Sequence, residues 1–176
     1  MNPDNKLMDM LTGYAAAHQH PFNIIVHLIG IPTIMLGALI PMTWLAFETR
    51  IGTITLAHLL VIGFLVFVMT LDRIFAIVFL VMALLLTMLA MRVGALPLAT
   101  SAAIAAAMFF GGYALQFVGH AVEKSMPVLV KHPIQANLAA PFFTIVELFK
   151  IAGLRSELFN AVQAEIAVRR QASATE

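Results

Sequence analysis

Four long apolar stretches dominate the pattern of hydrophobic and polar positions along the chain. They cover about residues 24–47, 51–71, 73–92 and 96–118, and the charged residues fall at their ends or between them. A helix that crosses the hydrocarbon core of a bilayer needs about 20 mostly apolar residues. The pattern therefore predicts four transmembrane helices. The short junction at Asp72 and Arg73 predicts a tight turn between the second and the third.

The pattern changes after the fourth stretch. Three prolines, Pro127, Pro133 and Pro141, fall within residues 121–141 and argue against one continuous helix there. From about residue 142 to residue 170, apolar residues recur at helical spacing between charged ones, and they include Phe142, Ile145, Val146, Phe149, Leu158, Val162 and Ile166. This segment is predicted to be helical. It forms one or two helices that lie in the membrane interface, pack on the bundle, or do both.

The composition agrees with a membrane protein. Hydrophobic residues make up 61% of the 176-residue chain and charged residues 11%, whereas average soluble chains carry about 25% charged residues. A chain this short cannot bury so much apolar surface from water. We therefore expect an all-α, polytopic integral membrane protein that forms a single domain over residues 1–176. The net charge of +1 suggests no nucleic-acid partner.

Two further expectations concern the setting of the bundle. Small residues in the fourth stretch, among them Gly111 and Gly112, permit close packing against a neighbouring helix and thus also permit a homodimer. The polar N-terminus lacks the layout of a cleaved signal peptide, and the loops are short. These features favour a bacterial inner membrane, with the endoplasmic reticulum as the eukaryotic alternative.

Lysine and arginine are distributed unequally between the two ends of the predicted bundle. With four crossings, the N-terminus, the second junction and the C-terminal tail share one face, which carries Lys6, Arg73, Lys124, Lys131, Lys150, Arg155, Arg169 and Arg170. The opposite face carries Arg50 and Arg92. Positively charged loops favour the cytoplasmic side, so both termini are expected there.

The same parity argument brings five of the six histidines to that cytoplasmic end. They are His18, His20 and His27 at the start of the first stretch, and His120 and His132 after the fourth. Ionisable groups at a membrane are costly and tend to be functional, and neutral imidazole is a common metal ligand. The chain has no cysteine. The histidines therefore predict a metal site suited to iron, zinc, copper or manganese, unless they are separate surface contacts.

Local spacing points to two neighbours of these histidines. Asn23 lies four residues before His27, so the two share a helix face. Glu123 lies three residues after His120 and can accept the second ring N–H of a ligating histidine. Its alternative is an ion pair with a nearby lysine, Lys124 or Lys131.

Two polar residues within or between the apolar stretches have simpler explanations. His58 stands alone inside the second stretch and is expected to make a hydrogen bond between helices rather than to bind a metal. Asp72 is expected to cap a helix. No phosphate-binding loop, serine-nucleophile motif or HExxH zinc-protease motif is present.

Two sequence blocks resemble a known family. The first reads HxxPxNxxxH from His18 to His27 and is followed by Gly30-Ile31-Pro32; the second reads QFVGHAVEKSMP from Gln116 to Pro127 and is followed by His132-Pro133. Over about residues 14–149 the chain resembles the Mpo1-like family, long described as a domain of unknown function. Its characterised fungal member is an endoplasmic-reticulum 2-hydroxy fatty acid dioxygenase of phytosphingosine breakdown.

The resemblance implies an Fe(II)-dependent α-oxidation. A long-chain 2-hydroxy fatty acid and O₂ would be the substrates, and the acid would lose its carboxyl carbon as CO₂ and become one carbon shorter. The implied iron ligands are His18, His27, His120 and His132, with Asn23 and Glu123 as catalytic-site residues beside them. His20 stands at a position that we take as variable.

Two alternatives stay open. One is a zinc-dependent membrane lipid hydrolase that uses the same histidines. The other is a membrane protein without enzymatic activity that binds lipid or packs with a partner.

Overall fold

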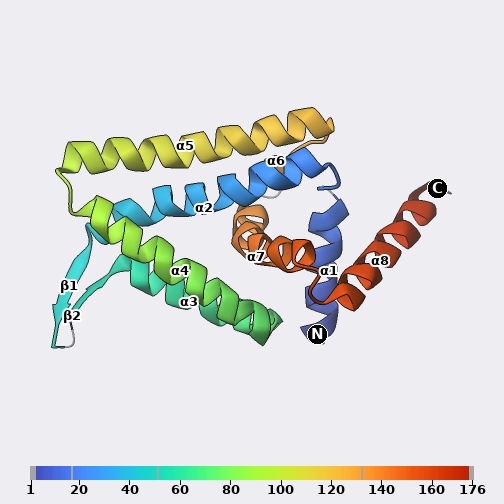
Figure 1. Ribbon diagram of the computed structural model, residues 1–176, viewed down its shortest axis with the longest axis horizontal. Helices are drawn as coiled ribbons and strands as arrows, with labels where there is room; N and C mark the ends of the chain where they lie inside the picture. Colours follow the sequence, from blue (N-terminus) through green and yellow to red (C-terminus); the bar gives the residue numbers. More distant parts are fainter. Residues whose placement is uncertain (1–2, 17, 51, 132, 175–176) are drawn as a thin grey trace.

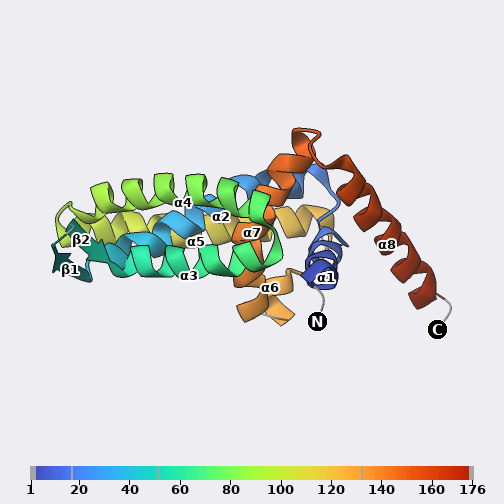
Figure 2. The same cartoon turned by 90° about the horizontal axis from the view of Figure 1, so that it is seen from below.

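The computed structural model describes residues 3–16, 18–50, 52–131 and 133–174. Its elements in chain order are α1 (Pro3–Ala16), α2 (Pro21–Thr43), β1 (Ala46–Thr49), β2 (Gly52–Thr55), α3 (Leu56–Leu71), α4 (Arg73–Gly94), α5 (Leu98–Glu123), α6 (Val128–Lys131), α7 (Pro133–Ile151) and α8 (Ser156–Ala174). The long helices α2 to α5 run back and forth along the molecule, and α1, α7 and α8 gather at one end (Figure 1, Figure 2). The two strands and the turn between α4 and α5 lie at the opposite end.

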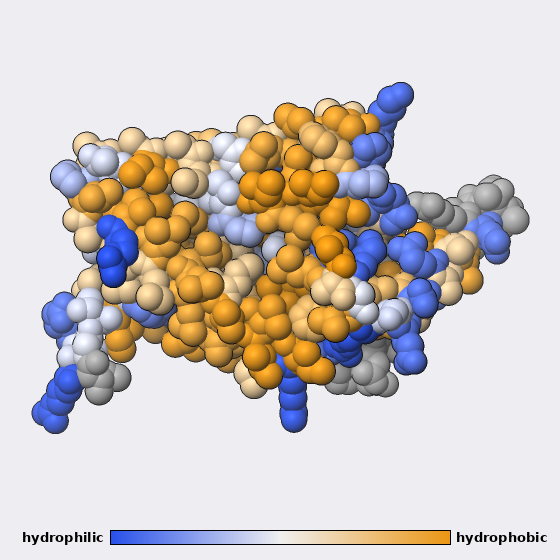
Figure 3. All heavy atoms as spheres, viewed as in Figure 1, coloured by the Kyte–Doolittle hydropathy of each residue, from blue (hydrophilic) through white to orange (hydrophobic). Residues whose placement is uncertain are grey.

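The described helices confirm an all-α polytopic membrane protein. Three of them, α2, α4 and α5, are long and apolar enough to cross a membrane, and a fourth span results if the bent pair α7 and α8 counts as one. Helix α3 is equally apolar but has 16 residues. Figure 3 shows that apolar surface covers much of the helices, with hydrophilic residues gathered toward the ends of the molecule.

The junction between the first two apolar stretches differs from the prediction of one span over residues 24–47 and the next over 51–71. Helix α2 ends at Thr43 and α3 begins at Leu56, and between them β1 and β2 form an antiparallel hairpin that pairs Ala46 with Thr55. Threonine and isoleucine recur in this segment and favour strands. Gly52 supplies a φ of 128° that other residues rarely adopt. A hydropathy pattern alone indicates neither the strand preference of these residues nor the turn at Gly52.

The prolines after α5 have different effects. Pro127 precedes the short helix α6 and Pro133 begins α7, as expected of residues that interrupt a helix. Pro141, in contrast, lies inside α7, so the predicted interruption of the helix within residues 121–141 is confirmed but occurs before this proline. Prolines inside apolar helices are tolerated where neighbouring groups satisfy the backbone, and α2 contains two of them, Pro32 and Pro41.

The C-terminal apolar stripe packs on the protein. Helix α7 contacts α2 and α4, and α8 contacts α1. A bend of 112° separates the two helices, so residues 142–170 fall in two helices, as the prediction of one or two allowed. The buried members of the stripe are Phe142, Ile145, Val146, Phe149, Val162 and Ile166.

Helices α2 and α5 pack against each other along most of their length. This packing fixes how the side chains of one helix are placed along the bundle axis relative to those of the other. A side chain added at Gly37 would place its first carbon 2.5 Å from the backbone nitrogen of Phe109. One added at Gly112 would lie 2.8 Å from the carbonyl oxygen of Gly30. The small residues of the fourth apolar stretch thus permit close packing within one chain.

His58 and Asp72 both cap helices. The Nδ1 atom of His58 accepts a hydrogen bond from the backbone N–H of Thr55 at 3.1 Å, so His58 closes the first turn of its own helix and the expected bond between helices was wrong. The carboxylate of Asp72 accepts from the backbone N–H groups of Ile74 at 2.8 Å and Phe75 at 3.0 Å, which confirms the expected cap at the start of α4.

Asp72 also fastens the C-terminal part of the chain to the bundle. Its carboxylate pairs with the guanidinium of Arg155, which comes from the turn between α7 and α8. The same guanidinium lies 4.8 Å from the centre of the Phe75 ring. One carboxylate therefore serves a helix cap and a contact between two distant turns.

We expect Asp72→Ala to lower the stability of the protein more than Arg155→Ala. The first change removes a helix cap worth about 1 kcal/mol together with the ion pair. The second removes the ion pair, which contributes about 1 kcal/mol or less at a partly exposed position, and the ring contact. Thermal unfolding in detergent measures both, and a larger loss for Arg155→Ala than for Asp72→Ala would contradict this assignment.

Candidate metal centre

Three histidines from separate elements converge at one end of the bundle. His18 lies between α1 and α2, His27 in the second turn of α2 and His120 in the last turn of α5. All three are buried, with exposed fractions of 2%, 4% and 3%. One ring nitrogen from each lies within 4.8 Å of the others. The convergence expected from the parity of the spans is thus confirmed for these three.

The second nitrogen of each ring is already engaged. The Nδ1 atom of His18 lies 2.9 Å from the carbonyl oxygen of Tyr14, and that of His27 lies 2.9 Å from the carbonyl oxygen of Asn23. Because a carbonyl oxygen only accepts hydrogen bonds, Nδ1 carries the proton in both rings. His120 Nδ1 lies 2.9 Å from the hydroxyl oxygen of Ser125, to which it can donate in the same way.

This arrangement leaves two lone pairs facing each other. The Nε2 atoms of His18 and His27 are 3.2 Å apart. Burial, reinforced by the nearby His27, lowers the pKa of His18 to about 3, so at pH 7 this ring is neutral and supplies no bridging proton. Two nitrogens that bind one metal ion at about 2.1 Å lie roughly 3.0–3.4 Å apart. The observed separation suits a shared cation.

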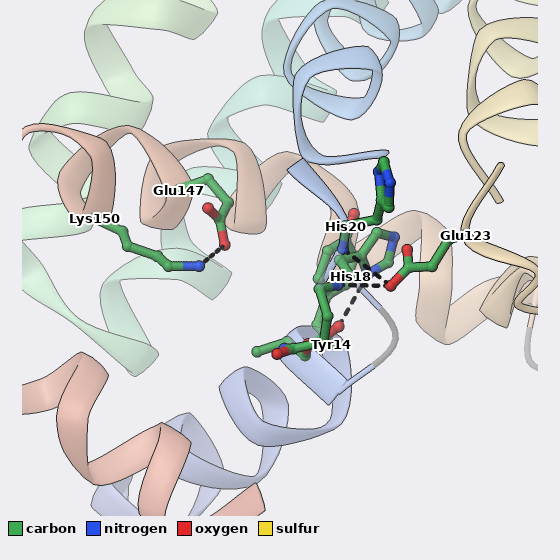
Figure 4. A network of polar contacts seen from close by, with 8 residues as sticks. Tyr14, His18, His20, Glu123, Glu147 and Lys150 are labelled. Carbon is green, nitrogen blue, oxygen red and sulfur yellow. Dashed lines mark hydrogen bonds and ion pairs between the residues drawn. The ribbon is translucent and has the colours of Figure 1, made fainter. Parts of the chain in front are cut away.

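His18 is held in place by aromatic packing although it belongs to no long helix. Its ring stacks on Tyr14 with 3.9 Å between ring centres and 9° between planes. Tyr14 in turn packs on Phe143 of α7 at 3.5 Å. Burial, with a smaller contribution from Glu147, raises the pKa of the Tyr14 phenol, so this ring stays uncharged. Figure 4 shows Tyr14 beside His18.

Glu123 joins the end of α5 to the beginning of α2. Its carboxylate accepts hydrogen bonds from the backbone N–H groups of Gln19 at 2.7 Å and His20 at 3.2 Å, and from the side-chain amide of Asn23. Figure 4 shows Glu123 reaching from α5 toward the turn that carries His18 and His20. Glu123 therefore holds that turn, whereas the Nδ1 atom of His120 has Ser125 as its partner.

The other sequence-predicted candidates fall into two groups. His20 is exposed, and its Nδ1 atom accepts from the backbone N–H of Phe22 at 3.2 Å as the cap of α2, so it faces away from the cluster. His132 lies outside the described residues, and its place as a ligand stays a prediction.

Sequence reasoning missed Tyr14, Ser125 and Gly119. The signal for Tyr14 was its position four residues before His18, the same spacing as between Asn23 and His27. Ser125 follows Lys124, whose φ of 56° turns the chain back beyond the end of α5, and helical periodicity cannot anticipate such a contact. Gly119 contributes through its lack of a side chain, because an added carbon would lie 2.2 Å from the Asn23 side-chain oxygen.

A large apolar cavity adjoins the histidine cluster. It has a volume of about 660 Å³, and Tyr14, His18, His27 and His120 line it at one end. The rest of its wall comes from α2, α3, α4, α5 and α7 and the segment before α7, and is mostly apolar, including Ile34, Met35, Phe64, Phe79 and Phe109. A candidate metal centre with neutral ligands thus borders a chamber suited to a hydrocarbon chain.

Comparison with protein families agrees with this architecture. A family model described as 2-hydroxy-palmitic acid dioxygenase Mpo1-like matches residues 5–151. This range contains the three histidines, the Glu123 contacts and every residue of the cavity wall. The chain belongs to the Mpo1-like family. No curated protein and no solved structure matches it. In this Mpo1-like protein, α8 lies beyond the matched range.

The geometry predicts that three histidines of the Mpo1-like protein bind metal and that a fourth, close in sequence, does not. His18→Ala, His27→Ala and His120→Ala should each lower metal affinity at least about tenfold, since each removes a candidate ligand. His20→Ala, the matched control from the same turn, should retain it. Titration of detergent-purified, tag-free protein with Fe(II) under anaerobic conditions measures this. Equal losses for His20→Ala and His27→Ala would rule out the assignment.

A second prediction concerns the Glu123–Asn23 contact. Gly119→Ala would place a carbon 2.2 Å from the Asn23 side-chain oxygen and 2.4 Å from a methyl group of Val26. We expect this clash to move α2 against α5 and to lower metal affinity about tenfold. Gly111→Ala, with nothing within 4 Å of the added carbon, is the control. Unchanged affinity in Gly119→Ala would show that the contact does not position the histidines.

Proposed function

We propose that this protein is an Fe(II)-dependent dioxygenase that shortens long-chain 2-hydroxy fatty acids by one carbon. The observation that supports it best is the position of three buried imidazoles, with Nε2 atoms free to bind a cation, at the end of an apolar cavity. The matching family description, which names a 2-hydroxy-palmitic acid dioxygenase, agrees with that geometry.

A 2-hydroxy fatty acid matches both parts of this site. Its hydroxyl and carboxylate oxygens stand on adjacent carbons and can chelate one metal ion, and its tail fits an apolar chamber. Because the tail would move from lipid into an equally apolar cavity, its transfer contributes little affinity. The contacts of the head group with the histidine cluster then decide which lipids bind productively.

The reaction is balanced without a further reductant. R–CH(OH)–COOH and O₂ give R–COOH, CO₂ and H₂O; the bond between the two terminal carbons breaks, and those carbons supply the four electrons that reduce O₂. Iron, when bound, would activate O₂ and orient the substrate. The backbone carbonyls of Tyr14 and Asn23 would orient two of the ligating rings, and the apolar wall of the cavity would hold the tail of the substrate.

Asn23 and Glu123 would serve this chemistry as positioning residues. The side-chain amide of Asn23 donates to the Glu123 carboxylate, which also accepts from the backbone of the turn before α2. Asn23 also offers the carbonyl that orients His27. We propose His132 as a further ligand on the basis of its sequence position. We also propose that the cluster faces the cytoplasm, in a bacterial inner membrane or the endoplasmic reticulum.

The test is conversion of 2-hydroxypalmitate by the Fe(II)-loaded protein in lipid nanodiscs. We expect equal amounts of O₂ consumed, CO₂ released and pentadecanoate formed, and no turnover of palmitate, which lacks the hydroxyl group. His27→Ala should abolish the reaction. If loaded protein leaves 2-hydroxypalmitate intact but hydrolyses a lipid ester when loaded with Zn²⁺ in the absence of O₂, the hydrolase alternative replaces this proposal.

A further inference from the structure

The cavity extends along the bundle for a measurable distance from the histidine cluster. On α2 its lining runs from His27 to Ala38 and the adjacent Leu39, and on α5 it runs from His120 to Phe109. Ala38 lies eleven positions after His27, and Phe109 lies eleven positions before His120. This offset corresponds to about 16 Å at 1.5 Å per residue and returns to the same helix face after three turns. Both helices therefore define the same length.

The lengths measured along α2 and α5 describe the same part of the cavity because the two helices are in close contact. Gly30 of α2 touches Gly112 of α5 near the histidine end, and Gly37 touches the backbone of Phe109 near the other. Ala38 follows Gly37 directly, so Ala38 and Phe109 lie at the same height near the part of the lining that is farthest from the histidines. Leu60 of α3 lines the cavity as well.

This length corresponds to a particular hydrocarbon chain. An extended carbon chain advances about 1.3 Å per bond, since C–C bonds are about 1.5 Å long and zigzag. A distance of about 16 Å thus holds about 12 carbons beyond the head group. On the α2 face Ile31 and Ile34 are bulky, whereas Ala38 presents a single methyl group where the tail would end.

We propose that Ala38 and Phe109 determine the acyl chain length that this protein accepts, with Ala38 leaving room for the last carbons of a chain of about 14–16 carbons. The identity of the head group that binds at the histidines is taken from the proposed function. The length limit rests on the cavity and holds for any single-chain lipid whose head lies at the histidine cluster.

Two substitutions at the far end should change the preference in opposite directions. Ala38→Leu adds carbon atoms at the end of the cavity and should favour shorter chains. Phe109→Leu removes part of the facing wall and should favour longer ones. Ala107→Leu is the matched control, because Ala107 is exposed on α5 and does not line the cavity.

Two readouts separate this proposal from the proposed function. The first is kcat/KM for 2-hydroxy acids of 12, 16 and 18 carbons. The second is competition of laurate, palmitate and stearate with a spin-labelled fatty acid on the protein in nanodiscs, which needs no turnover. In both, the ratio of the 12-carbon to the 16-carbon compound should rise about tenfold or more in Ala38→Leu relative to Ala107→Leu. The 18-carbon to 16-carbon ratio should rise in Phe109→Leu.

Each outcome supports or overturns the proposed length limit. Shifted binding ratios without any turnover would support the length limit and refute the dioxygenase. Ratios in both variants equal to those of Ala107→Leu would overturn the length limit, and so would a loss in Ala38→Leu that is the same for every chain length. If Ala38→Leu fails to fold, as judged by thermal unfolding, the direction of the shift in Phe109→Leu decides alone.

Discussion

Two neutral imidazoles that face each other with unprotonated nitrogens are the constraint on which the site depends. The 3.2 Å between the Nε2 atoms of His18 and His27 is unfavourable for two lone pairs and favourable for two ligands of one cation. Both rings are fixed in the same way, because each donates from Nδ1 to the carbonyl of the residue four positions earlier. The backbone thereby selects the tautomer that leaves Nε2 free.

The rest of the structure brings the third imidazole to that pair. Close contact between α2 and α5 fixes their relative height, and Glu123 ties the end of α5 to the turn that precedes α2. Tyr14 and Phe143 bring α1 and α7 against His18. A candidate metal centre can then border an apolar cavity whose described lining includes no charged side chain, since such a side chain would be costly in a bilayer.

The sequence predicted the fold class and the convergence of His18, His27 and His120, because both follow from simple regularities. Apolar runs of membrane-spanning length indicate the helices, and the alternation of direction brings residues near Asn23 to the same end as His120. What it could not predict depends on local backbone preference. The strands around Gly52, the continuation of α7 through Pro141 and the capping role of His58 all arise within runs that hydropathy treats as uniform.

The contacts around the three histidines could not be predicted from the sequence either, for a different reason. Ser125 meets His120 only because Lys124 adopts a left-handed conformation. Asn23 reaches Glu123 only because Gly119 leaves room for it. The first contact depends on the backbone conformation of one residue, and the second depends on a missing side chain. The spacing of residues along the sequence indicates neither feature.

The central claim is that the three histidines bind one metal ion together. X-ray absorption spectroscopy at the iron edge of the Fe(II)-loaded protein in nanodiscs tests it most directly. We expect at least three imidazole nitrogens at about 2.1 Å from the iron. A spectrum with oxygen ligands and no imidazole scattering, or one unchanged by His27→Ala, would contradict it.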